Sequence, residues 1–397
     1  MALPTDKLCS KAALPFLRSR KPGADRIGRR VCPIMPGRFL IHHAMTAVPP
    51  LSPSPDLPAS AIDAAGANLR DLLALALEHG PDHAALVVYD TRTGLSRALA
   101  EAYRRNLPDA RFVDFDSVEP GEVLALFKTL APKDLVVLVQ STNFRLDGFR
   151  LRVELFKLGL KVIEHVHLSR MPGAQGEHYI ESLAYDPQYF RGVGHALKQR
   201  IDRARRAEVH GGGEVLVFDS AFESAKLNVG DYSAMPNAGG QFPIGEVFTE
   251  ARDLEAVSGR ARIHVFGDTS YLVNRPGKPV TIVIERGRVV EAIDATPEFQ
   301  EVLDIIRRDE GEVWVRELGF GMNRAFTRER RVDDIGTYER MCGIHLSLGA
   351  KHGVYAKPGF KRKDARYHID VFAVTDAVYL DDERVYADGA WTVAPAA

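Results

Sequence analysis

Short apolar segments alternate with segments of helical apolar spacing between residues 59 and 166. Ala84–Tyr89, Leu135–Gln140 and Lys161–Val166 predict strands, and Ala61–Leu77 and Leu95–Asn106 predict helices. Strands that alternate with helices form a parallel sheet with helices on its faces. The pattern predicts an α/β domain over residues 59–213. Its further predicted elements are the strand Arg111–Asp114 and the helices Glu122–Leu130, Val153–Leu158 and Gln188–Arg206.

The pattern changes after about residue 214, where short β-like runs prevail and only Glu298–Arg308 predicts a clear helix. This favours a β-rich α+β domain over residues 214–397. The sequence His210-Gly-Gly-Gly213 between the two parts is more typical of a flexible junction than of a phosphate cradle. The predicted strands are Val215–Phe218, Arg262–Phe266, Val280–Glu285, Val289–Ala292, Val313–Val315, Ile369–Val374 and the hairpin Val378–Leu380/Arg384–Tyr386.

Residues 1–58 differ from both parts. Residues 1–44 hold nine Lys and Arg against Asp6 and Asp25, and five prolines follow between positions 49 and 58. We predict a disordered basic leader and a Pro-rich linker, with translation from Met45 as an equivalent interpretation. An organelle-targeting segment and a functional arm remain alternatives, whereas the apolar core of a secretory signal is missing.

The composition excludes several classes of protein. Cys9, Cys32 and Cys342 form no C-x-x-C pair and no disulfide framework, which indicates a reducing, cytoplasmic compartment. No apolar run approaches the roughly 20 residues of a membrane helix. The formal net charge of −1 gives no field that would attract nucleic acid or anionic lipid. We expect no nucleic-acid or membrane partner. The first predicted strand is followed by no G-x-G-x-x-G, so the sequence does not support a dinucleotide-binding site. The sequence also lacks the G-x-S-x-G motif of serine hydrolases.

Carboxylates and imidazoles gather beside glycine and apolar residues in the second part. Glu246 follows a Phe-Pro-Ile-Gly sequence, and Glu317 stands where we expect a strand to end in a glycine-rich turn. His345 lies in a Gly-Ile-His-Leu-Ser-Leu-Gly sequence. His368 and Asp370 are two positions apart, so on a strand they face the same side. Each residue alone is more often a cap, a surface group or a buried histidine, but together they indicate a metal site.

These motifs resemble those of the thermophilic metallo-aminopeptidases, the family of aminopeptidase T, aminopeptidase S and PepS. The resemblance rests on Phe242–Thr249, Glu317–Asn323, Ile344–Gly349 and His368–Asp370, is strong over about 225–395 and is weak over 59–210. It implies two divalent ions (zinc, cobalt or manganese) that activate a water to hydrolyse N-terminal residues from small peptides. It also implies a homodimer. The implied ligands are Glu246, Glu317, His345, His368 and Asp370, of which at least one carboxylate must bridge the ions.

The sequence departs from the family at one catalytic position. Seven residues after the site histidine, relatives of aminopeptidase T carry a tyrosine that is thought to assist catalysis. Here His352 takes that position, and the nearest tyrosine is Tyr355. Either side chain could donate a hydrogen bond to a developing oxyanion. We take His352 as the candidate catalytic residue, with a solvated loop histidine as the alternative. The α/β part is also short for the family.

Two other functions stay open. Mononuclear Fe(II) ring-cleaving dioxygenases of the dihydroxypyridine type resemble these peptidases in sequence. Their resemblance implies a histidine at the position of Glu317 and neither Glu246 nor His345, so the five retained ligands favour the peptidase. A catalytically altered biosynthetic relative would keep the fold and change the reaction.

Overall fold

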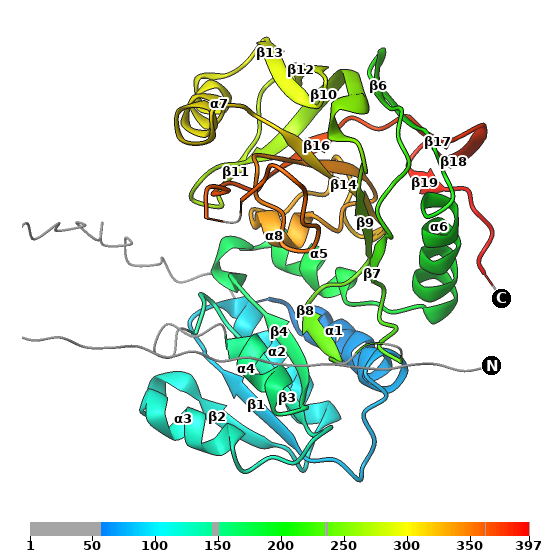
Figure 1. Ribbon diagram of the computed structural model, residues 1–397. Coiled ribbons are helices and arrows are strands. Elements are labelled where there is room, and N and C mark those ends of the chain that lie inside the picture. Colours follow the sequence, from blue (N-terminus) through cyan, green and yellow to red (C-terminus); the bar gives the residue numbers. More distant parts are fainter. Residues whose placement is uncertain (1–56, 145–150, 234, 236, 362, 397) are drawn as a thin grey trace, which may run out of the picture. The chain divides into compact units, whose positions relative to one another are not determined.

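The predicted parallel sheet, sheet A, is present in the computed structural model, which describes residues 57–144, 151–233, 235, 237–361 and 363–396. The strand order within the described residues is β2-β1-β3-β4-β8, with all neighbours parallel (Figure 1). The central strand β3 is apolar and buried at every position, as expected of a strand covered on both faces. The strands are β1 (Ala85–Tyr89), β2 (Arg111–Asp114), β3 (Leu135–Val139), β4 (Lys161–His165) and β8 (Gly239–Gln241).

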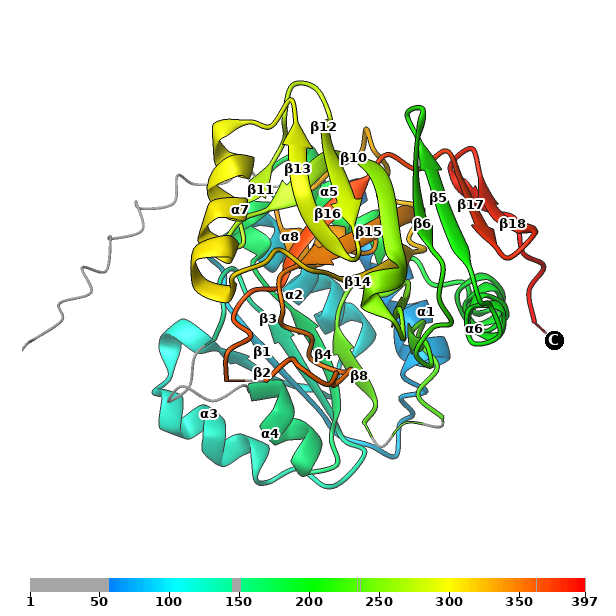
Figure 2. The same ribbon diagram turned by 45° about the horizontal axis from the view of Figure 1, so that its top comes forward.

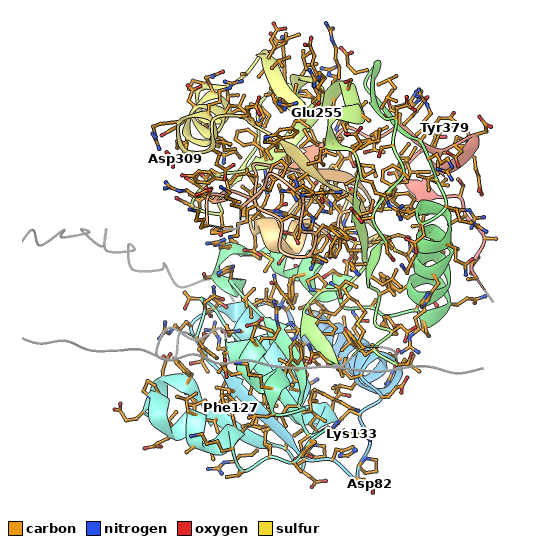
Figure 3. The ribbon with its side chains drawn as sticks, viewed as in Figure 1. Asp82, Phe127, Lys133, Glu255, Asp309 and Tyr379 are labelled. Carbon is orange, nitrogen blue, oxygen red and sulfur yellow. The ribbon has the colours of Figure 1, made fainter. Side chains whose placement is uncertain are left out.

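Different helices cover the two faces of sheet A. Val87 of β1 packs with α1 and α2, whereas its neighbours Leu86 and Val88 pack with α3 and α4. Phe127, the last residue of α3 and labelled in Figure 3, is buried in the same cluster as Leu86 and Val88. This arrangement confirms the α/β prediction for the first part. The helices are α1 (Ala59–Asp71), which continues as the π-helical turn η1 (Leu72–Ala76), α2 (Gly94–Asn106), α3 (Pro120–Phe127), α4 (Leu151–Lys157), α5 (Ala174–Ser182) and α6 (Gly194–Ile201).

The second part is the antiparallel sheet B (Figure 2). The path of strands within the described residues is β19-β18-β17-β5-β6-β10-β16-β15-β14-β9-β7, and β11, β12 and β13 extend it from β10. The helix α7 (Pro297–Glu310) packs on β10 through the rings of Phe299 and Phe266. The strands that carry the site are β9 (Glu246–Glu250), β14 (Val315–Gly321), β15 (Gly343–Leu348) and β16 (Ile369–Ala373). The others are β5 (Ala207–Gly211), β6 (Glu214–Phe218), β7 (Lys226–Asn228), β10 (Val257–Gly267), β11 (Val273–Asn274), β12 (Val280–Glu285), β13 (Arg288–Ile293), β17 (Ala377–Leu380), β18 (Glu383–Ala387) and β19 (Ala390–Trp391).

Two predictions for the junction between the two parts were wrong. The predicted helix Gln188–Arg206 ends at Ile201, because the chain turns into β5, which pairs with β6 and β17. The triple glycine is the turn of the β5–β6 hairpin: Gly212 and Gly213 have φ values of 59° and 85°, which glycine adopts without strain. The predicted domain boundary at 213/214 falls in this turn, and the division into two domains stays a prediction. The predicted segment 1–58 lies almost wholly outside the described residues. Across the described part of the chain, every helix is too short or too polar to cross a membrane.

Candidate metal centre

Four neighbouring strands carry four of the five candidate ligands on one face of sheet B, and His368 directly precedes the fourth strand, β16. In the register of the sheet, Glu246 of β9 lies opposite Gly321 of β14. His345 of β15 lies opposite Gly319 of β14, and Asp370 of β16 lies opposite Ser347 of β15. Residues directly opposite each other in antiparallel neighbours project from the same face. The other face of these strands is apolar and belongs to the main hydrophobic core, with Val247, Leu318 and Leu346 fully buried.

Gly319 of β14 makes room for the candidate ligand His345. The predicted glycine-rich turn after Glu317 is wrong, because β14 continues as a strand through Gly319 to Gly321. A Cβ atom on Gly319 would lie 2.1 Å from Cε1 and Nε2 of His345. The imidazole of His345 therefore lies directly over the bare backbone of Gly319 and points toward the glutamates of the neighbouring strands.

A β-bulge orients Glu317. Val315 and Leu318 of β14 pair with Leu348 and Leu346 of β15, so Arg316 and Glu317 together lie opposite one residue, Ser347. The Glu317 backbone N–H donates to the Ser347 hydroxyl over 3.0 Å. Bulges of this kind redirect side chains and are frequent beside functional sites. Here the bulge places the Arg316 and Glu317 side chains in adjoining parts of the same buried region.

The five side chains form two overlapping groups that could each hold a metal ion. One group is Glu246, Glu317 and His345, and the other is Glu317, His368 and Asp370. Nε2 of His345 lies 3.3 Å from Oε1 of Glu246 and 3.4 Å from Oε1 of Glu317. Nε2 of His368 lies 3.1 Å from Oδ1 of Asp370. Glu317 belongs to both groups, so its carboxylate lies where a bridging ligand would.

Two of the candidate donor atoms are buried without a hydrogen-bond partner, which fits a metal ion better than a hydrogen-bond network. His345 Nε2 and Asp370 Oδ1 are buried and have no hydrogen-bond partner among the described residues. An unsatisfied buried polar atom costs about 1–3 kcal/mol, and a cation between these atoms would remove that cost. Ligands about 2.1 Å from a tetrahedral ion lie roughly 3.4 Å from one another, close to the separations observed here.

The charges of the site favour cations. Burial would lower the pKa of His345 and His368, but the neighbouring carboxylates outweigh it and raise both values to about 10. Burial likewise opposes ionisation of Glu317, yet His345 and His352 lower the pKa of its carboxyl group. Burial and the Asp370 carboxylate raise the pKa of Glu339 well above its usual range. In the metal-free protein, protonated imidazoles thus balance the carboxylates that would otherwise repel one another.

Hydrogen bonds give His368 and His352 opposite tautomers. Nδ1 of His368 lies 3.1 Å from the Lys351 carbonyl, so this nitrogen carries a proton and Nε2 is free to bind a metal. Nδ1 of His352 instead accepts the backbone N–H groups of Val354 and Tyr355. A neutral His352 therefore carries its proton on Nε2, which lies 3.1 Å from Glu317 Oε2 without a hydrogen-bond partner among the described residues. The Nε2 proton of a neutral His352 therefore lies beside the candidate ligand Glu317.

Tyr355 is turned away from this position. Its hydroxyl donates to the Ser224 carbonyl over 2.7 Å, and the ring rests against Phe248. Its hydrogen is therefore engaged by the backbone, whereas the proton of His352 is not. Of these two side chains, His352 is the one whose proton is not engaged by a backbone carbonyl.

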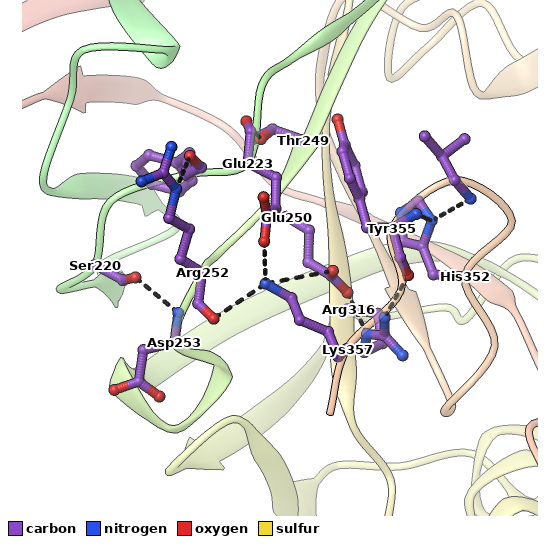
Figure 4. A network of polar contacts seen from close by, with 12 residues as sticks. Ser220, Glu223, Thr249, Glu250, Arg252, Asp253, Arg316, His352, Tyr355 and Lys357 are labelled. Atoms are coloured by element: carbon purple, nitrogen blue, oxygen red, sulfur yellow. Dashed lines mark hydrogen bonds and ion pairs between the residues drawn. The ribbon is translucent and has the colours of Figure 1, made fainter. Parts of the chain in front are cut away.

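A buried network fixes the loop that carries His352 (Figure 4). Glu250 of β9 forms an ion pair with Arg316 of β14, and both side chains are almost fully buried. The Arg316 guanidinium also donates to the carbonyls of Ala350 and Tyr355. Lys357 lies 3.8 Å from Glu250 and donates to Glu223 over 2.6 Å. The strands β9 and β14, which carry two of the candidate ligands, therefore also hold both ends of the loop 350–357.

Sequence reasoning missed the charged residues that support the ligands. Nη1 of Arg340 lies 3.3 Å from Oε2 of Glu246 and also pairs with Glu339. Glu250 follows Glu246 by four positions and shares its strand face, which was the one available signal. Arg316 lies directly before Glu317, but only the bulge brings both side chains to one side.

Comparisons with known proteins show the fold. The chain is similar to a 2,5-dihydroxypyridine dioxygenase of Pseudomonas putida KT2440, with a TM-score of 0.56 and 15% identity over 85% of this chain and 99% of the other. It is also similar to the wild-type aminopeptidase AmpT of Thermus thermophilus, with a TM-score of 0.52 and 14% identity over 83% and 99%. No family model and no curated protein matches the sequence. The fold is thus one that a peptidase and a dioxygenase share.

Proposed function

We propose that this protein is a metal-dependent aminopeptidase that uses two divalent ions to hydrolyse N-terminal residues from small peptides. The observation that supports this most is the position of Glu317 in both ligand groups. Five donors with one shared carboxylate suit a pair of ions about 3.5–4 Å apart, the arrangement of two-metal hydrolytic sites. A single ion would leave two or more of these buried donors unpaired.

The chain contributes binding and proton transfer around the ions. Two bound ions would supply a water of lowered pKa and would polarise the scissile carbonyl. Arg340 holds Glu246 in position through its 3.3 Å contact. The Nε2 proton of His352 can be donated to the developing oxyanion or to the leaving amine. The carboxylates would favour the free α-amino group of a peptide, which would explain a restriction to N-terminal residues.

The decisive experiment combines metal content with peptide hydrolysis. The purified protein, loaded with zinc, cobalt or manganese, should hold two ions per chain and release amino acids from unblocked dipeptides. An N-acetylated peptide should be a poor substrate. Glu317→Ala should abolish activity and lower the metal content, whereas Glu298→Ala, which removes an exposed carboxylate on α7, should change neither. Equal hydrolysis of acetylated and free peptides would contradict the proposal.

A ring-cleaving dioxygenase is the second candidate, supported by the structural similarity to the Pseudomonas enzyme. That reaction would require one Fe(II) per chain and would consume oxygen. Oxygen uptake with a dihydroxypyridine, only after loading with Fe(II), would favour it. Two ions per chain and undiminished peptide hydrolysis under anaerobic conditions would favour the aminopeptidase.

A further inference from the structure

A cleft of about 360 Å³ opens beside the candidate metal centre. His368 and Asp370 are among its lining residues, so a molecule in the cleft would reach the proposed ions. The volume is at the small end of the range for small-molecule sites, about 300–1,000 Å³. The walls of the cleft come from both sheets. At or beyond the carboxyl ends of β4 and β8 lie His167, Arg170 and Gln241. The segments that connect the strands of sheet B contribute Tyr271, Asp334, Ile335, Gly336, Glu339, Lys351 and Gly353.

The side of sheet A that forms this wall is where parallel sheets bind ligands. β4 ends at His165 and β8 ends at Gln241, so both carboxyl ends meet at the cleft. Loops and side chains beyond the carboxyl ends of parallel strands are the usual ligand-binding edge of such sheets. The cleft therefore joins a binding edge of sheet A to the ligand face of sheet B.

The cleft carries hydrogen-bond donors and positive charge that the protein itself does not use. Lys351 is exposed, and its ammonium group forms no ion pair with any described residue. Nη1 of Arg170 contacts the Asp334 carboxylate and the Tyr271 carbonyl at 3.0 Å each. Its Nε and Nη2 donate to no described residue. The buried Asp334 offsets the charge of Arg170, and Glu339 pairs with Arg340, so Lys351 is the cation of this wall that no described carboxylate neutralises.

Lys351 is also close to a ligand. Its carbonyl lies 3.1 Å from Nδ1 of His368, so its flexible side chain begins beside the metal centre. Two extended residues span about 7 Å, which suits a peptide whose amino end is at the centre and whose carboxyl end is farther along the cleft. The cleft thus offers carboxylates at the candidate metal centre and an unpaired ammonium group on a flexible side chain, the two kinds of charge that a zwitterionic short peptide requires.

We propose that this cleft binds the C-terminal carboxylate of a dipeptide or tripeptide, with Lys351 as its charge partner and Arg170 and Gln241 as further donors. The inference rests on the proposed aminopeptidase function and assigns its substrate class: short peptides with a free C-terminus. A C-terminal amide has no carboxylate for Lys351 to pair with, and the carboxylate of a long peptide would lie too far from the ions to reach Lys351.

The experiment compares leucyl-leucine with leucyl-leucine amide. The wild-type protein should show a KM at least about tenfold lower for the free acid, and Lys351→Met should bring the two KM values together. Lys351→Arg should keep most of the preference. The matched control is Lys361→Met, which removes another exposed lysine of the 350–366 segment outside this cleft. Equal KM values in the wild type, or an equal loss for both peptides in Lys351→Met, would overturn the inference.

A binding measurement separates this inference from the proposed function. Leucyl-leucine with a CH₂–NH group in place of the peptide bond cannot be hydrolysed. Its free acid should bind the zinc-loaded protein at least about tenfold more tightly than its amide, and Lys351→Met should remove the difference. If neither natural peptide is cleaved but this difference is found, the function fails and the carboxylate site stands. If acid and amide analogues bind equally, the carboxylate site is refuted whatever the activity.

Discussion

Gly319→Ala tests the candidate centre without removing any ligand. The substitution adds one methyl group in β14, where a Cβ atom would lie 2.1 Å from Cε1 and Nε2 of His345. Nonbonded carbon atoms are most stable about 3.5–4.0 Å apart, so the imidazole would have to move by about 1.4 Å or more. His345 is 1% exposed and packs against Phe372, which leaves the ring no free space to move into.

The expected effect on metal binding is large. Ligand distances in metal sites hold to about ±0.2 Å, so a shift of more than 1 Å removes His345 from the site. Changes to residues that merely support a ligand already weaken metal binding about 10–100-fold. We therefore expect at least about a 100-fold loss of affinity for one ion, which equals about 2.8 kcal/mol. Overpacking should also destabilise the metal-free protein by about 1–3 kcal/mol.

The assay is calorimetric titration of the metal-free protein together with metal analysis after dialysis. Wild type should take up two ions per chain and Gly319→Ala one tightly bound ion. Gly277→Ala is the matched control, because a Cβ atom there meets nothing within 4 Å. If Gly319→Ala bound two ions with wild-type affinity, His345 would not be a ligand and the reasoning from the glycine contact would be refuted.

Three further predictions address the proton donor, the buried network and the pH dependence of stability. His352→Gln should lower kcat about 10²–10⁴-fold with both ions retained and KM little changed, and loss of an ion would show instead that His352 is a ligand. Arg316→Met should destabilise the protein by about 3–5 kcal/mol in urea unfolding, because Glu250 would lose its buried partner. The double variant Arg316→Met/Glu250→Leu should recover much of this stability, because it leaves no unpaired buried charge. Burial between Tyr103 and Tyr179 lowers the pKa of His165 to about 3, whereas the pKa of this group in the unfolded chain is about 6.5. The stability that neutral His165 contributes is therefore present above pH 6.5 and is lost as the pH falls toward 3. Between pH 7 and pH 5, the metal-free wild type should therefore lose about 2 kcal/mol more stability than His165→Gln, and equal losses would show that His165 is protonated in the folded state.

Local sequence patterns identified much of the fold. The predicted helices Leu95–Asn106 and Glu298–Arg308 differ from α2 and α7 by two residues or fewer at each end, because their apolar periodicity agrees with their tertiary packing. The prediction Gln188–Arg206 was too long at its C-terminal end. Residues 207–211 gain more from pairing in sheet B than from another helical turn, and such long-range pairing leaves little trace in the local sequence.

The sequence by itself determined which side chains could bind a metal ion and that two of them lie on the same side of the chain. The two-residue period of an extended chain places Asp370 of β16 and His368, which directly precedes this strand, on one side wherever the strand lies. The tertiary structure alone decided that Glu317 is shared, because this depends on the bulge opposite Ser347 and on the register of four strands. It also decided the tautomers of His368 and His352, since their partners come from segments distant in sequence or from the loop's own backbone. Residue type and spacing encode periodicity, whereas register and hydrogen-bond partners follow from packing over the whole chain.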